Sequence, residues 1–239
     1  MILVCMATVL ACLVVIGLLY FGLIVLTYAF PKTPIPDPAK MRIAFVGDSI
    51  TFGRRLPFTS ERSFPRVIGK NLGADYQVLN FGKSGRTLQK SGDMPYLRDK
   101  LYRASLECRA MSTVIMLGTN DSKPQNWDSA NYERELGELI DVYRALDHPP
   151  SVILMTPPAV FVRKGRTSPV FKIIADVIRD EVRPIVLRVA RDKGVASIDL
   201  WDETKDHPDW FRDGVHPNKP GTTAIGTFVL SRLEDLAVI

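Results

Sequence analysis

Five short apolar runs alternate with longer amphipathic segments along most of this chain, and this alternation limits its possible folds more than any other feature. The apolar runs cover residues 42–46, 76–81, 112–117, 151–155 and 195–200. Runs of this kind are typical of strands buried on both faces, as in parallel sheets. Helical patterns lie between and after them, at about 63–72, 96–107, 129–146, 169–193 and 220–236. The order predicts an α/β domain, three-layered α/β/α, with a doubly wound, five-stranded parallel sheet.

The first 30 residues have a different character from the rest. Residues 1–30 contain no Asp, Glu, Lys or Arg, and a membrane-spanning helix needs roughly 20 apolar residues. The segment lacks the basic start and the small-residue cleavage site of a signal peptide. Cys12 in the string VLAC could instead mark a lipoprotein box, but the apolar run continues well beyond it. We therefore predict an uncleaved, single-pass transmembrane helix that anchors the chain in a membrane.

A proline-rich stretch, PKTPIPDPAK, follows this segment and is expected to be a semi-extended linker. The predicted organisation is therefore an anchor at 1–30, a linker at 31–41 and one folded domain at 42–239. The chain has 31 Lys and Arg residues against 26 Asp and Glu residues. This small excess is scattered and forms no basic stripe, which argues against nucleic acid as a partner.

Polar, glycine-bearing strings follow the first three predicted strands, and another lies just before the last predicted helix. They are GDSIT at 47–51, NFGKSGRT at 80–87, GTND at 118–121 and DGVHPN at 213–218. Each alone is ordinary loop chemistry. In a doubly wound sheet, however, ligands bind at the carboxyl ends of the strands. Together the four strings place a hydroxyl, two glycine loops, an amide and an Asp–His pair on one rim.

A serine at a strand end becomes a nucleophile only when a neighbouring base takes its proton, and histidine is suited to that role near neutral pH. Ser49 is the candidate nucleophile. The chain has three histidines, of which His148 lies in a turn and His207 in a less favourable loop. His216 follows Asp213 by three residues, so the carboxylate can accept a hydrogen bond from its second ring nitrogen. We predict Ser49, His216 and Asp213 as a catalytic triad.

A tetrahedral intermediate also needs donors for its oxyanion. The backbone N–H groups of Ser49 and Gly85 and the side-chain amide of Asn120 could supply three. Glycine at 85 lets the backbone approach a reacting carbonyl closely. The chain contains no G-x-S-x-G string, which excludes an ordinary α/β-hydrolase.

The strings GDSIT, NFGKSG, GTND and DGVHPN, in this order and spacing, resemble the four blocks of the SGNH or GDSL hydrolase superfamily. The resemblance extends over essentially all of residues 42–236. It implies a flavodoxin-like fold, with Ser49 as the nucleophile, Gly85 and Asn120 as oxyanion donors, and His216 with Asp213 as the base and its orienting group. The longer strings NFGKSGRTL, VIMLGTNDSKPQNW and LMTPP are similar to the sialate O-acetylesterase-like branch.

These observations predict a serine esterase that hydrolyses short-chain, acetyl esters, with a carbohydrate or a small molecule as the substrate and no cofactor. Three alternatives remain open. A lysophospholipase or thioesterase would act on longer acyl chains. An inactive, membrane-tethered binding module would have kept only the fold. A metallophosphoesterase would use Asp48, Asn120, Asp121 and His216 as ligands, although such sites usually draw on several histidines.

Arginines next to the predicted site suggest the kind of substrate. Arg54 and Arg55 follow the nucleophile string, and Arg86 follows Gly85. Guanidinium groups bind carboxylates in a bidentate manner, and the loops offer little apolar surface for a long acyl chain. We predict that these three arginines bind an acidic sugar, such as an O-acetylated sialic acid or uronate.

Two observations disagree on the side of the membrane. Lys32, Lys40 and Arg42 follow the predicted span, which by the positive-inside rule favours a cytoplasmic domain. The resemblance to esterases of external glycans favours the other side. We expect the domain to be extracytoplasmic.

Overall fold

The computed structural model describes residues 12–20, 22, 32–54 and 63–239. The chain forms two compact units, Met1–Lys32 and Thr33–Ile239. In the first unit, residues 12–20 and 22 are helical. The predicted anchor at 1–30 lies mostly outside the described residues, and so does Arg55. No helix in the described ranges combines the length and the apolar character needed to cross a membrane.

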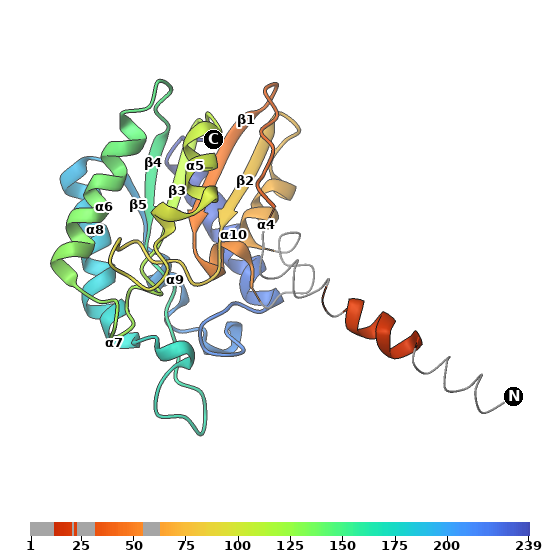
Figure 1. Cartoon of the computed structure of the whole chain (residues 1–239). Helices are drawn as coiled ribbons and strands as arrows, with labels where there is room; N and C mark the ends of the chain where they lie inside the picture. The colour runs from red at the N-terminus through yellow and green to blue at the C-terminus, as the bar shows by residue number, and fades with distance from the viewer. Residues whose placement is uncertain (1–11, 21, 23–31, 55–62) are drawn as a thin grey trace, which may run out of the picture. The chain divides into compact units, whose positions relative to one another are not determined.

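The second unit is built on a five-stranded parallel sheet with the strand order β2-β1-β3-β4-β5 (Figure 1). Its strands are Met41–Gly47 (β1), Tyr76–Gly82 (β2), Ser112–Met116 (β3), Ser151–Met155 (β4) and Ala196–Ile198 (β5). The predicted α/β class and parallel sheet are confirmed. The last strand is shorter than predicted because Asp199 caps the helix that begins at Leu200.

Helices cover both faces of the sheet. They run over Ser49–Phe52 (α2), Phe64–Asn71 (α4), Lys100–Glu107 (α5), Ser129–Arg144 (α6), Ala175–Val177 (α7), Arg183–Lys193 (α8), Leu200–Thr204 (α9) and Lys219–Asp235 (α10). Successive residues of a strand point to opposite faces. Ala44 and Val46 of β1 therefore share a core with α5, α6 and α8. Ile43 and Phe45 share another with α4 and α10.

The single helix predicted at 169–193 is wrong, because four short elements replace it. They are a 3₁₀ turn at Val170–Lys172 (η2), then α7, a π-helical turn at Ile178–Val182 (η3) and α8. Phe171 and Lys172 have left-handed backbone conformations, with φ of 61° and 59°, and such residues cannot continue a right-handed helix. Pro184 lacks the N–H that would bond to the carbonyl four residues earlier.

Part of the predicted linker packs against the start of β2. The N–H of Asp37 donates to Gln77 Oε1 at 2.7 Å, and Gln77 Nε2 donates to the carbonyl of Ile35 at 3.0 Å. Arg42 Nη1 donates to the carbonyl of Asp37. These contacts explain why the compact unit begins at Thr33.

The end of β2 lies directly against α2, the short helix that follows β1. A Cβ atom at Gly82 would lie 2.4 Å from the backbone nitrogen of Phe52 and 2.7 Å from the carbonyl carbon of Thr51. Asn80 Nδ2 also donates to the carbonyl of Thr51 at 2.8 Å. Only glycine allows this approach, so β2 fixes the position of α2 on the sheet edge.

Replacing Gly82 with alanine should lower the free energy of unfolding by about 1–3 kcal/mol, the usual cost of overpacking, because the added Cβ would meet the backbone of α2. Urea denaturation of the purified protein measures this change. Gly73→Ala is the matched control, since a Cβ there meets nothing within 4 Å. Equal stability of the two variants would contradict the close packing of β2 on α2.

Candidate active site

Ser49 stands at the carboxyl end of β1, where the chain turns at once into α2. Asp48 caps this helix, with its Oδ1 accepting the N–H of Ile50 at 2.8 Å. The N–H of Ser49 lies in the first turn of the helix, where no helical carbonyl can accept it. Gly53, at φ 87°, ends the helix after one turn. The capped turn thus fixes both the hydroxyl and the N–H of Ser49 at the rim.

His216 joins Ser49 to Asp213. Its Nε2 lies 2.9 Å from Ser49 Oγ, and its Nδ1 lies 2.8 Å from Asp213 Oδ2. The other carboxylate oxygen of Asp213 accepts the N–H groups of Val215 and His216, at 2.9 and 2.7 Å. All three site residues are buried. The Asp-x-x-His spacing therefore produces a tight turn in which one carboxylate holds both the backbone and the ring.

The charge state of Asp213 follows from these contacts. Burial by itself raises the pKa of the Asp213 carboxyl, but hydrogen bonds from the ring and backbone of His216 and from the N–H of Val215 outweigh it. They hold the pKa well below its usual range. An ionised carboxylate only accepts hydrogen bonds, so Nδ1 of His216 carries the proton. Nε2 is then free to accept the hydroxyl proton of Ser49.

The loop after β4 supports the turn that carries Asp213 and His216. The N–H of Phe161 donates to the carbonyl of Gly214 at 2.8 Å. Gly214 has a φ of 86°, and a Cβ there would lie 2.1 Å from the carbonyl oxygen of Phe161. The Phe161 ring packs on that of Phe211, with centroids 5.4 Å apart. Glycine at 214 therefore lets the two backbones touch.

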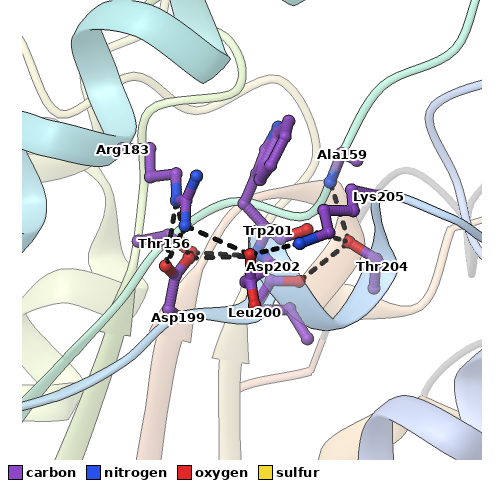
Figure 2. Close-up of polar contacts among 9 residues, drawn as sticks. All are labelled: Thr156, Ala159, Arg183, Asp199, Leu200, Trp201, Asp202, Thr204 and Lys205. Atoms are coloured by element: carbon purple, nitrogen blue, oxygen red, sulfur yellow. Dashed lines mark hydrogen bonds and ion pairs between the residues drawn. The ribbon is translucent and has the colours of Figure 1, made fainter.

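A polar network braces this loop in turn, at the ends of β4 and β5 (Figure 2). Thr156 Oγ1 donates to Asp199 Oδ1 at 3.0 Å, and Arg183 Nε and Nη2 donate to Asp199 Oδ2 at 2.9 and 2.7 Å. The N–H of Ala159 donates to Thr204 Oγ1 at 2.9 Å. The segment after β4 is thus tied to both α8 and α9.

The two other predicted oxyanion donors lie beside Ser49. Gly85 has a φ of 81°, a conformation that other residues rarely adopt. Asn120 is buried, and its Nδ2 lies 3.2 Å from the carbonyl of Arg86 and 3.3 Å from Asp48 Oδ2. Gly85 and Asn120 both line a cavity with Ser49 and His216. The structure thus brings together the residues predicted for the triad and the oxyanion site.

Asp121 ties the loop after β3 to the loop after β2. Its carboxylate oxygens accept the N–H groups of Leu88 at 3.0 Å and Gln89 at 2.8 Å. Burial raises the pKa of Asp121 to about 6, partly offset by these two N–H groups and reinforced by the nearby Asp48. Burial also raises the pKa of Asp48. Two buried carboxylates therefore stand next to Ser49 and Asn120 in the chain.

The cavity beside Ser49 has a volume of about 120 Å³. Arg54 lines it, as predicted from the sequence. Arg86 does not line it. The Arg86 Nε and Nη2 atoms donate to Asp99 Oδ2 at 3.1 and 2.6 Å, and Lys83 Nζ lies 2.9 Å from the same oxygen. The structure thus places Arg86 in an ion pair outside this cavity, and its predicted role as a substrate ligand stays a prediction.

Lys123 and Phe171 are among the residues of this cavity that the sequence did not single out. The buried Lys123 has its Nζ 3.2 Å from Asp93 Oδ2. The Phe171 ring lies edge-on to the His216 ring, with centroids 5.6 Å apart. Arg54 Cζ lies 5.6 Å from the centroid of the same Phe171 ring. Lys123 lies just beyond GTND and could have been found there. Phe171 falls within the helix that the pattern wrongly predicted.

Among residues 12–20, 22, 32–54 and 63–239, no three His, Cys, Asp or Glu side chains form a group that could hold a metal ion. The described site is instead a hydroxyl, an imidazole and a carboxylate in one hydrogen-bonded series at the carboxyl edge of a doubly wound sheet. This is the arrangement of a serine hydrolase.

The chain belongs to the GDSL-like lipase/acylhydrolase family, whose model matches residues 45–224. The predicted superfamily, and with it the class of carboxylic ester hydrolases, is confirmed.

Individual relatives agree with this family. An acetylxylan esterase from Xylanibacter ruminicola is 31% identical over 220 residues, which cover 84% of this chain but only 45% of that protein. The chain thus matches less than half of the curated relative's length. A carbohydrate acetylesterase from Sinorhizobium meliloti has a similar fold, with a TM-score of 0.68, 19% identity and coverage of 82% of this chain and 100% of that one. An aryl esterase from M. smegmatis gives a TM-score of 0.66, 21% identity and coverage of 82% and 99%.

The raised pKa of Asp121 predicts a pH-dependent stability. An acid with a raised pKa binds its proton more tightly in the folded state. The stability that this tighter proton binding contributes is complete below the unfolded pKa of about 4, and it is lost as the pH rises through the folded pKa of about 6. Asp121→Asn cannot ionise, so the stability advantage of the wild type over Asp121→Asn should shrink by on the order of 3 kcal/mol from about pH 4 to about pH 7.

Urea unfolding of both proteins across this pH range measures the difference. The hydrogen bond lost in Asp121→Asn contributes equally at every pH. Only the change with pH in the stability difference between the two proteins therefore reports the titration of Asp121. A difference that is constant, or that grows as the pH rises, would contradict a raised pKa.

Proposed function

We propose that this chain is a serine esterase that removes acetyl groups from carbohydrate esters. The observation that carries the proposal is the hydrogen bond of 2.9 Å between Ser49 Oγ and His216 Nε2, at the wall of a cavity of about 120 Å³. The acetylxylan esterase that is 31% identical supports an acetylated carbohydrate as the substrate. The presence of all triad residues favours an enzyme over an inactive binding module.

In the proposed reaction, Ser49 Oγ attacks the carbonyl carbon of the acetyl ester while His216 Nε2 accepts the hydroxyl proton. The oxyanion binds the N–H groups of Ser49 and Gly85 and the amide of Asn120. His216 then donates the proton to the departing sugar oxygen, and the C–O bond breaks to leave Ser49 acetylated. A water molecule then gives a proton to His216 Nε2 and bonds to the acetyl carbon, the bond from that carbon to Ser49 Oγ breaks, and His216 returns the proton to Oγ as acetic acid leaves. Asp213 stays ionised and stabilises the imidazolium in both steps.

The size of the cavity favours a short acyl group. A water molecule occupies about 30 Å³ in the liquid, so a cavity of about 120 Å³ matches an acetyl group more closely than an octanoyl chain. Phe171, Ile173 and Val215 form its apolar walls. This argues for the acetylesterase and against the alternative of a lysophospholipase or thioesterase for long acyl chains.

Charge at the cavity favours an acidic sugar. Arg54 and Lys123 both line it. Lys123 is paired with Asp93, whereas Arg54 lies over the ring of Phe171 and forms no ion pair with a carboxylate of the described residues. A guanidinium in this position can bind a carboxylate on the sugar. Arg54 thus keeps the role that the sequence predicts for it.

We further propose that residues 1–30 tether the esterase to a membrane, with the domain on the extracytoplasmic side. The support is the absence of charged residues over this segment and a carbohydrate substrate of the kind found outside cells.

Ser49→Ala should lower kcat for acetyl ester hydrolysis by at least about 10⁴-fold, as expected when a triad nucleophile is removed, and should abolish labelling by a fluorophosphonate. Ser84→Ala, on the neighbouring loop, is the control and should keep both. Activity assays and mass spectrometry of the labelled protein measure these effects. Labelling that persists in Ser49→Ala would sink the assignment of the nucleophile.

The wild type should have a higher kcat/KM for acetyl than for octanoyl esters of the same alcohol. Phe171→Ala removes one wall of the cavity and should raise the octanoyl-to-acetyl ratio at least tenfold, since each buried CH₂ contributes about 0.8 kcal/mol. Lys172→Ala is the control, because Lys172 shares the left-handed backbone but does not line the cavity. A wild type that prefers octanoyl esters would reject the acetylesterase proposal.

A further inference from the structure

A second hollow lies beside the turn that carries Asp213 and His216, and we call it the basic depression. Its volume is about 490 Å³, within the range of roughly 300–1,000 Å³ that is typical of ligand sites. Two segments form it, one from the loop after β4 and one from the loop before α10. Its lining includes Phe161, Arg163, Lys164, Asp209, Phe211 and Arg212.

The basic depression carries a positive charge that the protein does not neutralise. Arg163, Lys164 and Arg212 line it together with a single carboxylate, Asp209. In the part of the chain that the structure describes, no ion pair joins any of the three cations to a carboxylate. Many other surface cations are paired, including Arg188 with Glu133 and Lys193 with Asp141, at 2.7 and 2.6 Å.

Three cations that line one hollow repel one another, and a bound anion offsets that repulsion. The site therefore suits a ligand that brings negative charge.

The walls of the basic depression are held firmly to the catalytic turn. Phe161 and Phe211 pack ring on ring, and the N–H of Phe161 donates to the carbonyl of Gly214. Phe211 also forms an antiparallel bridge with Pro217. The depression and the Ser49 cavity thus share one rigid turn.

The two hollows are lined by residues of the same short stretch of chain. Arg212 precedes His216 by four residues, so their Cα atoms are at most about 14 Å apart. Arg212 lines the basic depression, and His216 lines the Ser49 cavity. A short oligosaccharide spans this distance.

We propose that the basic depression is a subsite for a carboxylate-bearing sugar of an oligosaccharide whose acetyl ester enters the Ser49 cavity. The proposal rests on the acetylesterase function proposed above and adds that the enzyme acts on a polymer and holds more than one of its units. Arg163 and Arg212 bind the carboxylate through their guanidinium groups, Lys164 adds charge, and Phe161 offers apolar surface to the sugar ring.

Binding of an unacetylated oligogalacturonate to the full-length Ser49→Ala protein tests the subsite without any need for activity. Calorimetry at low salt should show that the added change Arg163→Ala/Lys164→Ala weakens binding about tenfold. Arg166→Ala is the matched control, because it removes a cation from the same loop that does not line the depression. A neutral xylo-oligosaccharide of equal length should bind more weakly and respond to neither change.

Kinetics provide the second readout, with Ser49 intact. Arg163→Ala/Lys164→Ala should raise KM for an acetylated oligogalacturonate about tenfold with little change in kcat, and should leave p-nitrophenyl acetate hydrolysis unchanged. Unchanged binding and KM in the double variant would overturn the subsite, and so would equal losses on acidic and neutral oligosaccharides or in Arg166→Ala. A wild type that binds the acidic oligosaccharide as expected but hydrolyses no acetyl ester would instead refute the proposed function and leave the subsite standing.

Discussion

The hydrogen-bonded register of the neighbouring strands β2, β1 and β3 is the constraint on which the site depends. Gly47 at the end of β1 pairs with Gly82 of β2 and with Met116 of β3. The three loops that follow therefore leave the sheet at one level, which brings Ser49 and Asn120 to the same cavity. Strand pairing uses backbone groups, so this level is set independently of the side chains at the rim. A slip of one residue would also turn every core side chain to the wrong face.

Buried carboxylates then join these loops to one another. Asp48 accepts the N–H of Ile50 and lies 3.3 Å from the Asn120 amide, while Asp121 accepts two N–H groups of the loop after β2. Burial makes both carboxylates costly to ionise, as their raised pKa values indicate. Removing either would leave buried N–H groups unpaired, which costs about 1–3 kcal/mol each. The carboxylates therefore specify one arrangement of the loops more than they stabilise the fold.

The sequence allowed the sheet and the central site to be predicted, because apolar runs that need burial on both faces leave few folds open. The Asp213–His216 spacing is equally restrictive, since it is local and histidine is scarce in this chain. Contacts between segments that are distant in the chain could not be predicted from the sequence pattern. Arg86 pairs with Asp99 because of where the chain turns before α5, and no periodicity encodes that. The position of Phe171 at the cavity was not predicted because its apolar neighbours fit a helical period, whereas the backbone at Phe171 is left-handed.

The left-handed backbone at Phe171 and Lys172 has a consequence for how this enzyme could diverge. A left-handed conformation costs a residue other than glycine roughly 1–3 kcal/mol, so a glycine or asparagine at either position would relieve strain. The segment also lies outside the sheet, whose register fixes the reacting groups. Changes there would alter the room beside Ser49 while the hydroxyl, the imidazole and their hydrogen bonds stay in place. The size of the acyl group that fits beside Ser49 can therefore change over evolutionary time by single substitutions. None of the variants along the way would have to lose the reacting groups.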